Sequence, residues 1–192
     1  MLIALGILAV TVIYFIGIYN TFQRLKTQIE ASIQEIGNQL KRQASLIPNL
    51  QASVKGYLKH EKGVFKMLTD ARKSATQAEK SGSMDDMDKA VQQLNAVVPR
   101  LQVAIEDNPE IKADQTVTKF MEELTDTADK LSYARRSLID LTQAFNQKMV
   151  TFPTNLVANI FGFKKQKGLS TPQTGAHVEV STKETKDVKV EL

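Results

Sequence analysis

Apolar side chains recur at alternating steps of four and three residues from Ile29 to Leu68. This spacing places them on one face of a helix, where they form a continuous seam for packing. The seam occupies positions 29, 33, 36, 40, 43, 47, 50, 54, 57, 61, 64 and 68, and only Gln43 and Glu61 among them are polar. Pro48 lies inside the seam without changing its phase. We therefore expect one long helix that is kinked or loosened near Pro48 rather than ended by it.

Two further seams of the same kind follow along the chain. One runs from Met84 to Ile105 and the other from Val117 to Phe145, and each follows a polar loop. Asp114 is suited to cap the last of these helices. The three seams predict an all-α protein, in which three long antiparallel helices form an elongated bundle and a short C-terminal helix follows.

Polar residues interrupt the seams at four expected core positions. Gln43 and Glu61 lie on the first seam, and Arg135 and Thr142 lie on the third. A charged side chain is rarely buried without a partner. We therefore expect Glu61 to pair with Arg135 across the bundle, where such a pair fixes register more often than it performs catalysis.

A short apolar segment, residues 152–163, begins at Phe152-Pro153 and is followed by Lys164, Lys165 and Lys167. Such a segment can lie on a membrane surface with its apolar side chains inward, or it can cap the open end of the bundle. Three antiparallel helices would leave it at the end far from the N-terminus, which favours the cap. Residues 164–192 contain too few apolar side chains to form a core and are predicted to be a disordered polar tail.

The first nineteen residues, MLIALGILAVTVIYFIGIY, contain no charged side chain. As a helix they would span about 28 Å, close to the ~30 Å hydrocarbon core of a bilayer. A cleaved signal peptide is the alternative, but the segment has no basic start and no small-residue cleavage site. The pattern predicts a transmembrane anchor at residues 1–19, a helical bundle at residues 20–163 and the tail at residues 164–192.

Basic residues flank this segment only on its C-terminal side, at Arg24 and Lys26 and then at Lys41 and Arg42. The loops that stay in the cytoplasm carry an excess of Lys and Arg. The orientation expected from this rule places the N-terminus outside and residues 20–192 in the cytoplasm.

The net charge of +4 is unevenly distributed. Residues 1–80 carry 11 Lys and Arg against 5 Asp and Glu, whereas residues 81–163 carry 8 against 12. Opposite charges in the two parts favour pairing within the molecule. They argue against nucleic acid as a partner, because such a protein is basic across its binding face.

Five lysines fall on one face of the first predicted helix: Lys55, Lys59, Lys62, Lys66 and Lys73. One interpretation is a docking stripe for an acidic partner or for anionic lipid head groups. The other is a solvated face, or a set of salt bridges to an acidic face at Glu122, Asp126 and Asp129. The opposite charges of the two parts favour the second interpretation. No aromatic side chains alternate with the lysines, as they do in single-strand nucleic-acid sites.

Candidate chemistry is sparse. The absence of cysteine excludes disulfides and thiol nucleophiles. His60-Glu61 resembles the start of a zinc-protease motif, but position 64, where the second histidine is needed, is valine. The remaining histidine is His177 in the tail. We expect no catalytic site, no metal site and no cofactor.

The segment QLKRQASLIPNLQASVKGYLKHE, residues 39–61, resembles the signature of the LemA family of bacterial membrane proteins. The signature is Q-L-K-R, a spacer, L-I-P-N-L, then V-K-G-Y and H-E. The matching residues are Gln39, Leu40, Lys41, Arg42, Leu46, Ile47, Pro48, Asn49, Leu50, Val54, Lys55, Gly56, Tyr57, His60 and Glu61. Further likenesses at residues 18–20, 108–114, 134–146 and 152–163 extend the resemblance over about residues 1–163. Four places depart from the family pattern: Ile33, Gly37-Asn38, Leu138-Ile139 and Phe145-Asn146.

The resemblance implies a single span in the bacterial cytoplasmic (inner) membrane, a mainly helical cytoplasmic body and no established enzymatic activity. Genes of this family often neighbour those for membrane metalloproteases and TPM-domain proteins, which suggests a protein partner of one of these kinds. The first hypothesis is a non-enzymatic scaffold or adaptor in the cell envelope. The alternative is an anionic-lipid-binding or membrane-remodelling protein that uses the basic stripe together with residues 152–163.

Overall fold

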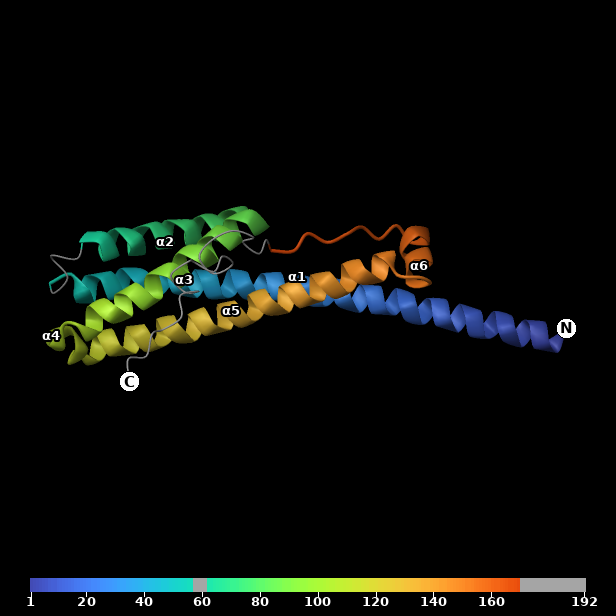
Figure 1. Ribbon diagram of the computed structural model, residues 1–192, viewed down its shortest axis with the longest axis horizontal. Helices are drawn as coiled ribbons and strands as arrows, with labels where there is room; N and C mark the ends of the chain where they lie inside the picture. Colours follow the sequence, from blue (N-terminus) through green and yellow to red (C-terminus); the bar gives the residue numbers. More distant parts are fainter. Residues whose placement is uncertain (57–61, 170–192) are drawn as a thin grey trace, which may run out of the picture.

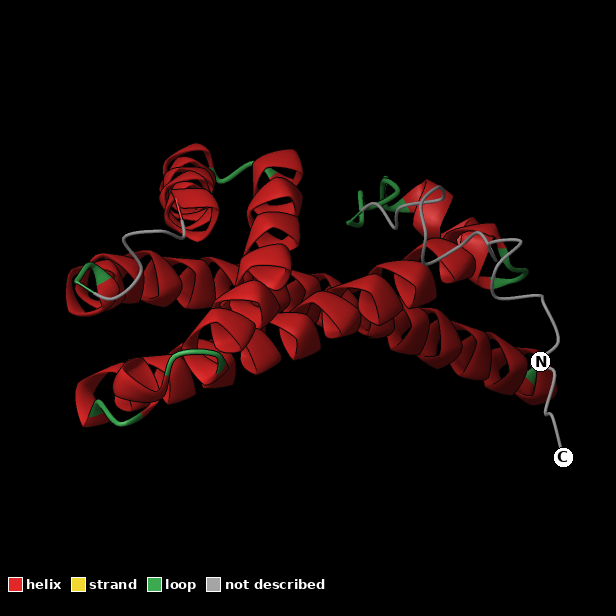
Figure 2. Ribbon diagram, turned by 60° about the vertical axis from the view of Figure 1, so that its left-hand side comes forward, coloured by secondary structure: helices red, strands yellow, loops and turns green. Residues whose placement is uncertain are grey.

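The computed structural model describes residues 1–56 and 62–169, and over these ranges the chain forms helices and loops without a strand (Figures 1 and 2). The helices are α1 (Leu2–Val54), α2 (Lys62–Ser81), α3 (Met84–Glu106), α4 (Pro109–Lys112), α5 (Gln115–Val150) and α6 (Thr154–Ile160). The expected all-α fold, with a long apolar N-terminal helix followed by a helical bundle, is confirmed.

The apolar N-terminal segment and the first seam belong to one helix, α1. Side chains before Ile18 are exposed or half-buried, and the buried side chains of the bundle begin with Ile18, Phe22, Leu25 and Ile29. Figure 1 shows the N-terminal part of α1 projecting beyond the other helices. By length and composition this part of the helix can cross a membrane.

The number of long helices differs from the prediction. The first predicted helix, which follows the seam to Leu68, is two helices, because α1 ends at Val54 and α2 packs back against it. The Gln51 amide donates to the Phe65 carbonyl over 3.4 Å and to the Thr69 hydroxyl over 3.1 Å. Periodicity does not reveal this hairpin, because the apolar positions keep the same phase on both sides of the turn.

Four long helices therefore run alternately away from and back toward the N-terminal segment (Figure 1). Gly82, with a φ of 59°, turns the chain between α2 and α3. Between α3 and α5, Asn108 caps the single turn of α4, and Asp114 accepts hydrogen bonds from the Thr116 and Val117 amides, as expected of a helix cap. The last long helix, α5, returns along α1 and brings α6 to the apolar segment.

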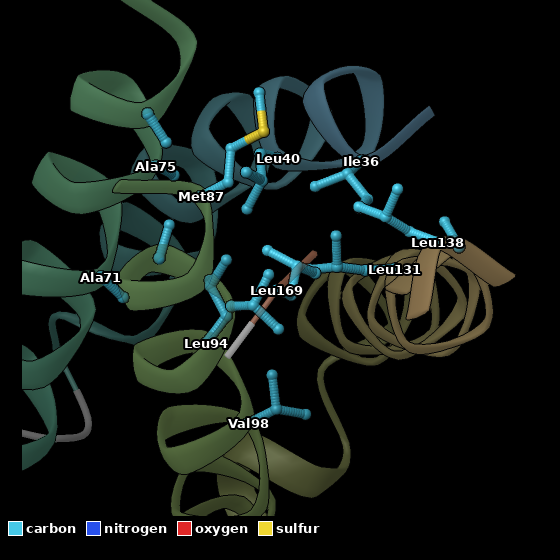
Figure 3. Close-up of a cluster of buried hydrophobic side chains, with 14 of the residues drawn as sticks. Ile36, Leu40, Ala71, Ala75, Met87, Leu94, Val98, Leu131, Leu138 and Leu169 are labelled. Carbon is cyan, nitrogen blue, oxygen red and sulfur yellow. The ribbon is translucent and has the colours of Figure 1, made fainter. Parts of the chain in front are cut away.

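The core lies where α1, α2, α3 and α5 meet. Figure 3 shows apolar side chains converging there from all four helices. Among them are Ile36 and Leu40 of α1, Ala71 and Ala75 of α2, Met87 and Leu94 of α3, and Leu131 and Leu138 of α5. The seams predicted from sequence therefore form the interior.

Residues 163–169 form a strap that follows α6 and packs on the bundle, whereas the sequence predicts a disordered tail from residue 164. Asn146 of α5 holds the strap, because its side chain donates to the Gln166 carbonyl and accepts from the Gln166 amide, both over 2.9 Å. Gly168 lies against the Thr142 side chain, so the strap covers this seam position. Leu169 is buried, and residues 170–192 lie outside the described residues.

Candidate functional site

Most described residues of the motif at 39–61 hold the bundle together. Five apolar motif residues point into the core: Leu40, Leu46, Ile47, Leu50 and Val54. Tyr57, His60 and Glu61 lie outside the described residues. Gln39 is half-buried beside this core, while Lys55 and Gly56 are exposed at the turn after α1. The described motif therefore marks the central helix of the fold and its packing surfaces.

The two basic residues of the motif contact different neighbours of α1. The Lys41 ammonium lies 3.4 Å from a Glu79 carboxylate oxygen on α2, and the Arg42 guanidinium lies 3.8 Å from Glu123 on α5. Both pairs are exposed, so each contributes at most about 1 kcal/mol. Their main effect is to fix the positions of α2 and α5 beside α1.

Pro48 does not end α1, which continues to Val54 as the seam predicts. Asn49 is exposed beside it, and its carbonyl accepts a hydrogen bond from the Ser53 hydroxyl over 3.0 Å. A bend of α1 at Pro48 stays a prediction.

Gln43 is a buried polar residue in the middle of this helix. Its side chain is fully enclosed, and within the described part of the chain neither amide atom has a hydrogen-bond partner. A buried amide in this condition costs about 1–3 kcal/mol. No chemistry follows from it, but it is a weak point of the core.

Replacing Gln43 by leucine, which has a similar volume, should raise the free energy of unfolding by about 1–3 kcal/mol, because the desolvation cost disappears. Thermal unfolding in detergent, followed by circular dichroism, measures the change. Gln34→Leu, at an exposed position of the same helix, is the matched control and should shift stability by less than about 0.5 kcal/mol. A loss of stability in Gln43→Leu would show that the amide has a partner in the folded protein.

The predicted lysine stripe is not a face of the first helix. Lys55 lies in the turn after α1, Lys62 begins α2, and Lys66 and Lys73 are exposed on α2, while Lys59 lies outside the described residues. Lys73 lies beside further cations of α2, namely Arg72 and Lys80, along a shallow surface groove. We call the surface formed by Lys66, Arg72, Lys73 and Lys80 the basic face of α2.

Among the described residues, salt bridges to the acidic face of α5, one of the alternatives for the stripe, are not formed by Lys55, Lys66 or Lys73. Across residues 1–56 and 62–169, neither Lys66 nor Lys73 takes part in an ion pair. The helix that carries them packs on α1 and α3, whereas the acidic face is on α5, where Asp126 pairs with Lys130 of the same helix. The basic face of α2 is therefore a solvated surface.

Arg135 pairs with Asp88 among the described residues, and its expected pairing with Glu61 stays a prediction. Its guanidinium lies 3.1 Å from a carboxylate oxygen of Asp88 on α3, whose other oxygen accepts a hydrogen bond from Gln92 over 3.2 Å. The proposed partner Glu61 lies outside the described residues. The seam position of Arg135 thus serves an ion pair between α3 and α5.

The described residues contain no group of three or more His, Asp and Glu side chains placed to hold a metal ion. Both histidines, His60 and His177, lie outside the described ranges. The candidate sites in the described structure are therefore surfaces. One of them, formed by residues 152–163, lies at a different end of the bundle from the one predicted from sequence.

An aromatic cluster joins α1, α5, α6 and the strap at the end of the apolar segment. Phe163 stacks on Phe22 with ring centroids 4.7 Å apart, and Phe145 meets Phe22 edge-on at 5.2 Å. Tyr19 contacts Phe161 at 4.8 Å and Phe163 at 5.8 Å. Residues 152–163 therefore lie beside the apolar segment and not at the far end, because the missed hairpin adds one more reversal of the chain.

The protein is an elongated helical bundle built on one continuous helix, with a projecting apolar N-terminal part and an exposed basic face. These features define a class of rod-shaped proteins, and the described residues contain no recognisable catalytic centre. The sequence pattern that defines the LemA family matches residues 32–182. The chain belongs to the LemA family. It is also similar to the protein LemA of Metamycoplasma hominis, with 24% identity over 159 residues that cover 79% of this chain and 69% of that protein.

Proposed function

We propose that this protein is a non-enzymatic scaffold or adaptor of the bacterial cell envelope, anchored in the cytoplasmic membrane by residues 1–19. The exposure of nearly all apolar side chains before Ile18 supports the anchor, because such a surface is stable in lipid and not in water. Arg24 and Lys26 on its C-terminal side favour a cytoplasmic bundle and an external N-terminus.

The observation that carries the scaffold role is the distance at which α1 holds the basic face of α2. The Lys41–Glu79 pair and the Gln51–Phe65 hydrogen bond fix α2 beside α1. These positions lie about 33 and 48 Å along α1 from Tyr19, at 1.5 Å per residue. Charge interactions are screened beyond about 8 Å at physiological salt. The basic face therefore suits an acidic protein surface at that height and not the head groups of the membrane that holds α1.

The same distance weakens the alternative, in which the basic stripe and residues 152–163 bind lipid as one surface. In Figure 1, α2 lies over the half of the bundle that is away from α6. A membrane metalloprotease or a TPM-domain protein, the partner classes suggested by family analogy, would meet the basic face through an acidic region outside the bilayer.

A photocrosslinking amino acid at Lys73 in living cells should give a discrete adduct of higher mass, and the same probe at Thr125 should not. Lys73 is exposed on α2 and Thr125 is exposed on α5, so the two probes sample surfaces of different helices. Mass spectrometry of the adduct identifies the partner.

Charge reversal distinguishes specific docking from chance proximity. Lys66→Glu combined with Arg72→Glu should reduce the Lys73 adduct several-fold, because like charges then face an acidic partner. Equal adducts from Lys73 and Thr125, or an adduct that is insensitive to charge reversal, would refute the docking role of the basic face.

A further inference from the structure

We propose that residues 152–163 are a second membrane contact, with α6 lying in the lipid interface beside the span of α1. The inference rests on the proposed anchoring by α1, and it assigns a ligand, the lipid of the same membrane, to a surface that the anchoring does not require.

The position of α6 supplies the first argument. A groove of about 400 Å³ lies between α1 and α6, and its walls are almost entirely apolar. They are formed by Thr11, Val12, Phe15, Ile16 and Tyr19 of the apolar segment and by Ile160 and Phe161. Since the α1 side of this groove belongs to the proposed span, the α6 side is at the same depth.

The exposed surface of residues 152–163 supplies the second argument. Phe152, Leu156 and Ile160 are spaced by four residues and are exposed, Phe152 by 75% and Ile160 by 69%. The next residue, Phe161, is exposed as well, while Val157 and Ala158 face the bundle. An exposed run of large apolar side chains of this kind is typical of a membrane or protein contact.

Depth and charge favour lipid over a protein. Val12 and Tyr19 are separated by about 10 Å along α1, which matches the 5–10 Å to which interfacial helices enter a bilayer. Lys164 and Lys165, both exposed, follow directly and can reach the head groups. A water-soluble partner would have to enter the bilayer to reach the groove, whereas acyl chains are already there.

The chain contains no tryptophan, so a single introduced tryptophan reports on its own surroundings. We would place it at Ile160 in the full-length protein, reconstituted in vesicles with and without brominated lipid. Ile13→Trp, exposed in the apolar segment, reports on the anchor, and Tyr133→Trp, exposed on α5, reports on the bundle. Tyr133 is about 18 Å along α5 from Phe145, at 1.5 Å per residue.

Brominated lipid should quench Ile160→Trp about as strongly as Ile13→Trp, with a blue-shifted emission, and should leave Tyr133→Trp unchanged. Phe152→Trp is a second probe, and both sites are exposed, so neither substitution disturbs the core. Quenching of Ile13→Trp without quenching at 160 or 152 would overturn the inference and leave the anchor intact. Absence of quenching at position 13 would overturn the anchor and the inference with it. Quenching of all the probes would show a rod that lies flat, and would also overturn the inference.

Discussion

Phe22→Ala should lower the free energy of unfolding by about 3–5 kcal/mol, a large share of the 5–15 kcal/mol typical of a domain. Phe22 is fully buried and contacts Phe145 and Phe163, so it joins α1 to α5 and to the strap. Truncation removes the ring contacts and leaves a cavity that these elements cannot fill. Urea unfolding in detergent, followed by circular dichroism, measures the loss.

Phe152→Ala is the matched control, since it removes the same side chain from an exposed position next to α6. In detergent it should change stability by less than about 0.5 kcal/mol. Equal losses from the two variants would contradict this prediction. They would show that the contribution of Phe22 to stability does not come from its burial in the aromatic cluster.

Arg135→Met should cost about 2–4 kcal/mol, somewhat less than the 3–5 kcal/mol for breaking a fully buried pair. The Asp88 side chain is only 8% exposed, so its carboxylate loses its guanidinium partner in a place that water hardly reaches. The expected cost is lower than for a fully buried pair because the Arg135 side chain is 22% exposed.

The double variant Asp88→Leu with Arg135→Met tests the reason for this cost. It should be more stable than Arg135→Met alone, because no charge is left buried. A double-mutant cycle under the same unfolding conditions gives the coupling between the two residues. A double variant as unstable as the sum of the two single variants would show that the residues act independently.

The seams show how far periodicity predicts this fold. Ile29, Ile36 and Leu40 are buried as the 4–3 spacing predicts, and Asp114 caps α5. The hairpin after Val54 was missed, because α1 and α2 are amphipathic helices whose apolar positions are in phase across the turn. From that one error followed the placement of residues 152–163 at the wrong end of the bundle.

The pairing of side chains between helices could not be predicted from the sequence pattern, for a different reason. Asp88 is next to Met87 of the second seam, and the spacing along one helix does not say which residue of another helix faces it. The strap is polar in composition, yet it is ordered by two hydrogen bonds to Asn146 and by the contact of Gly168 with Thr142. Such specific contacts arise only when the elements are brought together.

The continuity of α1 has a mechanical consequence. The apolar segment and the bundle share one uninterrupted helix, and the core begins at Ile18, so no loop separates the two parts. With α1 anchored as proposed, the whole rod would turn as one lever about the bilayer. From Tyr19 to Val54 the lever is about 52 Å long, so a sideways displacement of about 9 Å at its far end tilts the span by about 10°. A partner that pulls on the basic face would thereby change the angle of the helix in the lipid, and the lipid would resist that pull.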